Sequence, residues 1–113
     1  MWKYQDILER IFDGYEPEDD LYATRIKITD SRLVASQGPN YEEMTFEDGT
    51  FVLKGRFEDT RFERTSRCEY ESEEEALFYW LGSFSYLLPK DSEVKGRVDD
   101  LKKLLFGIVK EGA

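Results

Sequence analysis

Residues 72–89 of the chain read SEEEALFYWLGSFSYLLP, and this stretch decides how the rest must pack. It opens with a capping box, in which the Ser72 hydroxyl accepts from the Glu75 amide and the glutamate reaches back. Three glutamates in the first turn suit the positive end of a helix dipole. The predicted helix, 73–88, is apolar almost all round, and Pro89 ends it. We therefore expect other elements to cover more than one of its sides.

A second helix is predicted to follow over residues 91–110. Its apolar residues recur at alternating four- and three-residue steps, and Asp91 or Ser92 is its N-cap. A short loop before it predicts that it packs back on the preceding helix. We expect Gly82 and Ser85 to let the two backbones approach closely.

The first part of the chain predicts a helix followed by a sheet. Apolar residues over 2–12 form one helical stripe, and Gly14 suits the cap after it. From residue 21 to 70 the period changes to two, as in half-buried strands, and Asp48-Gly49 is a strong hairpin signal. The sequence thus predicts a single α+β domain, 1–113, with an N-terminal helix, a four- to five-stranded antiparallel meander with one exposed face, and two packed C-terminal helices.

Composition excludes several kinds of chemistry. The chain has 113 residues, no histidine and one cysteine, which rules out Ser-His-Asp and Cys-His catalysis, histidine-ligated zinc and internal disulfides. Strand parity groups Cys68 with Phe62 and Tyr70, so we expect its thiol to be buried and inert. No Walker, Rossmann or EF-hand spacing is present. We therefore predict a protein that is not an enzyme, with no catalytic residue, metal site or cofactor.

Negative charge is the strongest compositional feature. The formal net charge is −9, and the acidic residues gather in 1–20, 33–53 and 69–75. Clustered negative potential attracts a cationic partner, although solubility alone is the alternative explanation. Seven Tyr, eight Phe and two Trp exceed what a core of this size normally holds, and aromatic side chains beside acidic loops are typical of binding hot spots. The predicted partner-binding residues are Tyr15, Glu16, Glu18, Asp19, Asp20, Tyr22, Tyr41, Glu42 and Glu43.

Nucleic acid and membrane are not expected partners. Between residues 54 and 67 the local charge is only +2, which is too small to outweigh −9 against phosphate. We expect these basic residues to form cross-strand ion pairs on the exposed face of the sheet, with Glu58, Glu63 and Glu69. The polar N-terminus and the lack of a long apolar stretch predict a cytoplasmic protein.

Two exposed tyrosines on the predicted helix 73–88 are a further candidate surface. Tyr79 and Tyr86 lie seven residues apart, on one side of that helix. They form either a second exposed stripe or a strip that helix 91–110 covers, and we favour the covered arrangement.

The C-terminal part of the chain also carries a family resemblance. Residues 74–81, EEALFYWL, resemble the acidic-Leu-Leu-Tyr-Trp helix start of the immunity protein 63 family of bacterial polymorphic toxin systems. Residues 95–106, KGRVDDLKKLLF, resemble that family's Arg-x(2–3)-Asp-x-Arg-x-Leu-Phe stretch. The charged strands just before the helix sit where the family has Glu-Arg-Gly, so the match spans roughly residues 50–110. Lys102 stands in place of an expected arginine, and the Glu-Arg-Gly order is scrambled.

The resemblance implies a stoichiometric binder that neutralises a cognate protein toxin made by the same or a neighbouring cell. Because the chain is strongly acidic, we expect this toxin to be cationic, of nuclease type, and to be inhibited by occlusion. The resemblance also implies a family-core scaffold, in which Arg97 forms a buried pair with Asp99 or Glu75 and fixes the register of the last two helices. The scaffold residues are Glu75, Tyr79, Trp80, Arg97, Asp99 and Phe106. Two alternatives stay open: an acidic inhibitor from a phage or mobile element that mimics nucleic acid, and a non-catalytic homodimeric module with Tyr79 and Tyr86 in its interface. The sequence leaves open whether the protein is a monomer or a homodimer.

Overall fold

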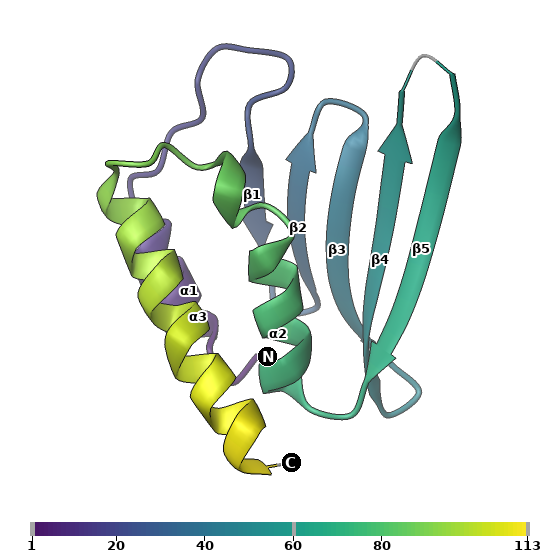
Figure 1. Cartoon of the computed structure of the whole chain (residues 1–113), viewed down its shortest axis with the longest axis vertical. Coiled ribbons are helices and arrows are strands. Elements are labelled where there is room, and N and C mark those ends of the chain that lie inside the picture. Colours follow the sequence, from purple (N-terminus) through teal and green to yellow (C-terminus); the bar gives the residue numbers. More distant parts are fainter. Residues whose placement is uncertain (1, 60, 113) are drawn as a thin grey trace.

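The structure, a computed structural model, describes residues 2–59 and 61–112 and has the predicted α+β architecture (Figure 1). One helix precedes a five-stranded sheet, and two helices separated by a short 3-10 turn follow it. The elements are α1 (Gln5–Ile11), β1 (Arg25–Ile28), β2 (Arg32–Gln37), β3 (Asn40–Glu47), β4 (Thr50–Glu58), β5 (Glu63–Tyr70), α2 (Glu73–Gly82), the 3-10 turn η1 (Ser85–Leu87) and α3 (Glu93–Gly112).

The sheet is an antiparallel meander in which the strands lie in chain order. The predicted hairpin is confirmed, because Glu47 pairs with Thr50 across Asp48 and Gly49. Both turn residues have positive φ, 51° and 84°, the backbone that a two-residue turn needs to match the twist of its strands. Asp48 tolerates this conformation better than most residues with a side chain.

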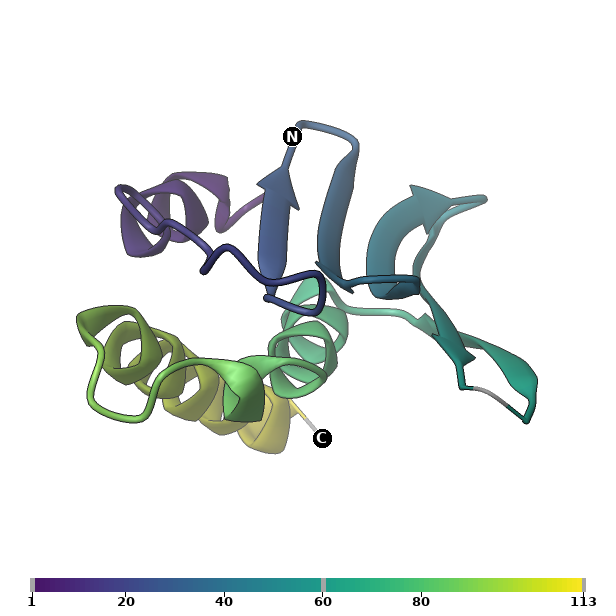
Figure 2. The ribbon, with the colours of Figure 1, turned by 90° about the horizontal axis from the view of Figure 1, so that it is seen from above.

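Helices α2 and α3 lie on one face of the sheet, and α1 lies beside its β1 edge (Figure 2). Helix α2 contacts β3, β4 and β5, α1 contacts β1, and α3 contacts α1 and α2. The β4–β5 hairpin reaches beyond the helices, so one end of the sheet is left uncovered on the helical side (Figures 1 and 2). This uncovered end positions the candidate site described below.

The opposite face of the sheet carries ion pairs, as predicted. Arg56 pairs with Glu58 at 3.0 Å and with Glu63 at 3.2 Å, and Arg67 pairs with Glu69 at 3.1 Å. Only the pair with Glu63 crosses between strands, because the other two join residues two apart on the same strand. None of the helices in the described ranges is long and apolar enough to cross a membrane.

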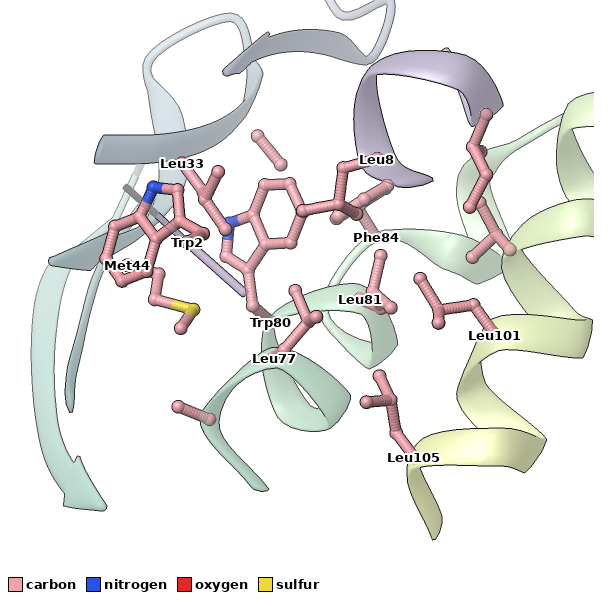
Figure 3. Packing of buried hydrophobic residues seen from close by; sticks show 14 of the residues in the cluster. Trp2, Leu8, Leu33, Met44, Leu77, Trp80, Leu81, Phe84, Leu101 and Leu105 are labelled. Carbon is pink, nitrogen blue, oxygen red and sulfur yellow. The ribbon is translucent and has the colours of Figure 1, made fainter. Parts of the chain in front are cut away.

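Trp80 is the centre of the core. It is fully buried and points from α2 toward the sheet, between Leu33 and Leu8 (Figure 3). Its indole Nε1 donates to the backbone carbonyl of Glu42 at 3.0 Å, and its ring centroid lies 4.9 Å from that of Phe84. One side chain thus joins helix, sheet and η1, which agrees with the expectation that this helix is covered on several sides.

The start of α2 agrees with prediction and its end does not. Ser72 caps the helix, because its Oγ accepts from the Glu75 amide at 3.1 Å. The helix ends at Gly82, whereas Leu88 was expected. Ser83 Oγ donates to the Trp80 carbonyl at 2.6 Å, and such a side-chain bond to the preceding turn competes with the helical backbone ladder. The chain then tightens into η1.

The packing of α3 against α2 differs in detail from expectation. Ser92 is the N-cap, since its Oγ accepts from the Lys95 amide at 3.1 Å. A side chain at Gly82 would meet no atom within 4 Å, so this glycine is not needed for close helix packing. Ser85 is buried and accepts from Lys102 Nζ at 3.2 Å, so it contributes a polar contact between η1 and α3.

Two expectations about exposure are wrong. Tyr79 and Tyr86 are 50% and 71% exposed, so α3 does not cover them. Tyr79 instead stacks on Tyr70 of β5, with ring centroids 5.4 Å apart. Cys68 is exposed, not buried, because β5 is an edge strand and the helices reach only its C-terminal end.

Candidate functional site

A groove lies at the uncovered end of the sheet, beside η1. It has a volume of about 460 Å³, within the range of roughly 300–1,000 Å³ typical of ligand pockets. The ends of β2 and β4 and the starts of β3 and β5 form its floor, and Tyr86 and Leu87 of η1 form one wall. It exists because α2 stops at Gly82, which leaves this part of the sheet without a helix above it.

Glu42 lies on the floor of the groove. In the sheet register it faces Gly55 on β4, which in turn faces Ser66 on β5. A methyl group added to Gly55 would collide with Glu42 Oε2 and would lie 2.8 Å from Ser66 Oγ. Glycine at this position therefore leaves the space that the carboxylate occupies, which is a common reason for glycine within a strand.

The Glu42 carboxylate has no ion-pair partner within residues 2–59 and 61–112. Burial raises its pKa above the usual range for glutamate, because the charged form loses hydration that nothing replaces. Gln37 lines the same groove, and its buried Nε2 lacks an acceptor among the described residues. The floor thus presents one carboxylate without an ion-pair partner among the described residues, beside a buried amide donor that lacks an acceptor there.

The acidic loop 16–20 is continuous with this groove through Tyr22. The Tyr22 amide donates to Asp20 Oδ1 at 2.9 Å, and its ring packs over Gly38 at the β2–β3 turn. A methyl group on Gly38 would come within 2.9 Å of that ring, and the φ of Gly38 is 59°. Glycine is thus required there both for the backbone and for the seat of Tyr22.

The structure brings together only part of the predicted partner-binding set. Tyr22 and Glu42, from separate segments of the chain, both line the groove. Tyr41 borders it as well, but it directly precedes Glu42 on β3, so its side chain points to the opposite face of the sheet. The acidic residues of the neighbouring loop are exposed, as expected, and these are Glu16, Glu18, Asp19 and Asp20.

Two predicted contact residues lie elsewhere. Tyr15 is half-buried, and its hydroxyl donates to the Thr24 carbonyl at 2.7 Å. Burial, with a smaller effect from Glu18, raises its pKa. Glu43 is on the opposite face of the sheet, where it pairs with Arg32 at 2.9 Å. Neighbouring residues of a strand point to opposite faces, so Glu42 and Glu43 cannot share one surface.

The prediction that Arg97 forms a buried ion pair is wrong. Arg97 is exposed and pairs with Glu93 at 3.2 Å, while Asp99 pairs with Lys95 at 2.8 Å. Each partner lies four residues earlier on α3, the spacing at which helical side chains meet most easily. The register of α2 and α3 is therefore set by apolar packing.

The other scaffold residues divide between core and surface. Trp80 is buried as expected, whereas Phe106 is 54% exposed, with its ring 5.8 Å from that of Phe78. Glu75 is only partly buried, at the start of α2. Tyr79 is half exposed on Tyr70, as described above.

Sequence reasoning missed four residues of the groove, namely Gln37, Gly55, Ser66 and Leu87, and considered Tyr86 only as part of a covered strip or a dimer interface. A glycine in mid-strand is a recognisable sign of close approach, so Gly55 was detectable. The others join the groove only because of where α2 ends, and no local pattern marks that.

The chemistry of the groove suits binding. Within the described residues there is no group of three or more side chains of the metal-ligating types. The groove combines a half-buried carboxylate, a free amide donor and aromatic walls. Arg64 also lines it, whereas Arg56, which borders the groove, pairs with Glu58 and Glu63 on the opposite face of the sheet.

In comparisons with protein-family models, curated proteins and solved structures, no match to this chain was found. The resemblance of residues 50–110 to the immunity protein 63 family therefore stays a prediction from the sequence.

Proposed function

We propose that this protein neutralises a cognate protein toxin, as the family resemblance implies, and that the toxin is cationic, of nuclease type, and blocked by occlusion. The observation that carries the proposal is that the exposed acidic loop 16–20 and the aromatic groove form one continuous surface, joined by the contact between Asp20 and Tyr22. Such a surface combines negative charge that attracts a cationic partner with an area that the partner can contact.

The two parts of this surface act at different stages of binding. Four exposed acidic side chains within residues 16–20 create a local negative potential, which raises the rate of encounter with a basic partner. Nucleases carry basic surfaces because they bind phosphate. The acidic loop therefore suits a toxin of that class.

The aromatic side chains supply affinity after encounter. Tyr22 and Tyr86 are 60% and 71% exposed, and Leu87 is 44% exposed beside them. Exposed aromatic groups around a concave surface gain binding energy when a partner removes them from water, and they are enriched among interface hot spots. Their position beside the acidic loop makes this end of the molecule the proposed contact face.

Co-purification from cells that carry the neighbouring genes tests the proposal. We expect the protein to retain a toxin domain in a one-to-one complex and to protect cells that express that toxin. Tyr86→Ala should weaken the complex about 30-fold, the loss typical of a hot-spot residue. Tyr79→Ala is the matched control, because it removes an exposed tyrosine of α2 that lies outside the groove.

Three results would contradict the proposal. One is a failure to protect cells from any neighbouring toxin. Another is a complex that Tyr79→Ala weakens and Tyr86→Ala does not. The third is displacement of DNA or RNA from a host protein without any effect on a toxin, which would favour the nucleic-acid mimic.

A further inference from the structure

We infer that the floor of the groove is a binding site for one arginine side chain of the partner, whose guanidinium group pairs with the Glu42 carboxylate. This inference rests on the proposed function for the identity of the partner. It adds the chemical group that is recognised and the residue that recognises it.

The first argument is the state of Glu42 in the free protein. Its carboxylate lies over Gly55 and beside Ser66, in the space that a side chain at position 55 would fill. It belongs to no ion pair within the described ranges. A half-buried anion without a partner destabilises the fold, and a cation that enters the groove relieves this cost.

The second argument is the position of the groove's own charges. Arg56, next to Gly55, points to the opposite face of the sheet, where it pairs with Glu58 and Glu63 at 3.0 and 3.2 Å and not with Glu42. Arg64 faces Phe57 in the register, two residues along β5 from Ser66, and no ion pair joins it to Glu42 in the described part of the chain. An incoming cation therefore has to displace only water from Glu42, although Arg64 repels it from the end of the groove.

The third argument is the character of the walls. Tyr22 and Tyr86 line the groove with largely exposed rings. A guanidinium group is planar and weakly hydrated, so it stacks on aromatic faces better than the compact ammonium group of lysine. Together with the Glu42 carboxylate, these rings match an arginine side chain.

The experiment uses acetyl-arginine amide as the probe and acetyl-citrulline amide as its neutral isostere. Each is titrated into the ¹⁵N-labelled protein, and the NMR shifts of backbone and side-chain amides are followed. We expect the arginine probe alone to shift the Gly55 and Ser66 amides and the side-chain amide of Gln37. Binding is expected to be weak, because one side chain gives only a small contact area.

Three variants test the role of the charge. Glu42→Gln keeps the shape and should lower the affinity for the arginine probe at least about tenfold, since a charge-assisted pair is lost. Glu43→Gln, the matched control, removes the same charge from the opposite face and should leave affinity unchanged. Arg64→Gln should strengthen binding, because it removes a like charge. Dispersed NMR spectra confirm that each variant is folded.

Four outcomes would overturn the inference: equal shifts with citrulline, shifts confined to the acidic loop 16–20, unchanged affinity in Glu42→Gln, or weaker binding in Arg64→Gln. Failure of the proposed function is a separate result. If the probe binds as expected but no toxin is neutralised, the arginine site stands and the function is wrong. If a toxin is neutralised and Glu42→Gln binds both toxin and probe like the wild type, the function stands and the arginine site is wrong.

Discussion

Reversing the charge of the acidic loop should slow association with the toxin. The variant Glu18→Lys, Asp19→Lys, Asp20→Lys changes three exposed side chains and moves the net charge from −9 to −3. These residues lie beside the groove, so their field acts on the partner before contact. Because steering acts on the encounter, the effect should appear mainly in the association rate.

Coulomb's law gives the size of the effect. A unit charge on the toxin about 10 Å away interacts with each loop charge by about 0.4 kcal/mol in water. Reversing three charges changes the charge of the loop by six units. Screening over a Debye length of about 30 Å at 0.01 M salt leaves a loss of about 20-fold, and screening over about 10 Å at 0.1 M leaves about fivefold.

Stopped-flow or surface-based kinetics at the two salt concentrations measure this directly. The matched control reverses three exposed acids away from the groove, on the β5–α2 turn and on α3 (Figure 1): Glu71, Asp100 and Glu111. It reaches the same net charge and should slow association much less. Equal slowing in both variants, or a loss that does not shrink with salt, would refute the placement of the interface.

Three further predictions concern stability and ionisation. Trp80→Phe should lower the free energy of unfolding by about 2–3 kcal/mol, through the lost bond to the Glu42 carbonyl and the cavity left behind. Phe106→Leu, at a largely exposed site, should change it by less than about 0.5 kcal/mol, and urea unfolding measures both; equal losses would contradict the assigned core. Burial raises the pKa of Glu42 in the fold, so the wild type loses stability as pH rises from the unfolded pKa through the folded one. Glu42→Gln should therefore be more stable than wild type at pH 7 and match it below about pH 4. Urea unfolding at several pH values measures this, and a variant less stable than wild type at pH 7 would contradict the prediction. Burial and the neighbouring Cys68 raise the pKa of Tyr70 to about 12, so Tyr70→Phe should remove the last transition in a phenolate absorbance titration; an unchanged last transition would contradict this.

The sequence predicted the parts of the fold that local chemistry determines. The Ser72 N-cap, the Asp48-Gly49 hairpin and the alternation of the strands each depend on neighbouring residues, and each is present in the structure. Of the two bonds of the predicted capping box, the described residues show the one from the Glu75 amide to Ser72 Oγ. The predicted end of α2 was wrong, because the hydrogen bond from the Ser83 side chain competes with the backbone hydrogen bonds that would continue the helix. Periodicity does not register a bond of that kind.

Exposure was harder to predict than secondary structure. Cys68 has the parity of a core residue, but its strand lies at an edge that the helices do not cover. Arg97 pairs with Glu93 on its own helix and not with a buried carboxylate. Both outcomes depend on how far each helix extends over the sheet, which is a property of the assembled fold.

The candidate site was predicted as separate pieces. Tyr22 and Glu42 were chosen for their residue types beside acidic loops, and the fold gathers them into one groove. Tyr41 was chosen for the same reason and only borders the groove, because its side chain points to the other face. Glu43 was chosen for the same reason and lies on the other face. Strand parity separates the two glutamates once the strand is known, whereas the groove itself follows from the place where α2 ends.

Titration of the purified toxin's activity with this protein tests the central claim most directly. If the protein neutralises a toxin by occlusion, activity should fall linearly and reach zero at one equivalent. The Glu18→Lys, Asp19→Lys, Asp20→Lys variant should need an excess to do the same at low salt. Toxin activity that stays unchanged in the presence of several equivalents of the wild-type protein would contradict the account.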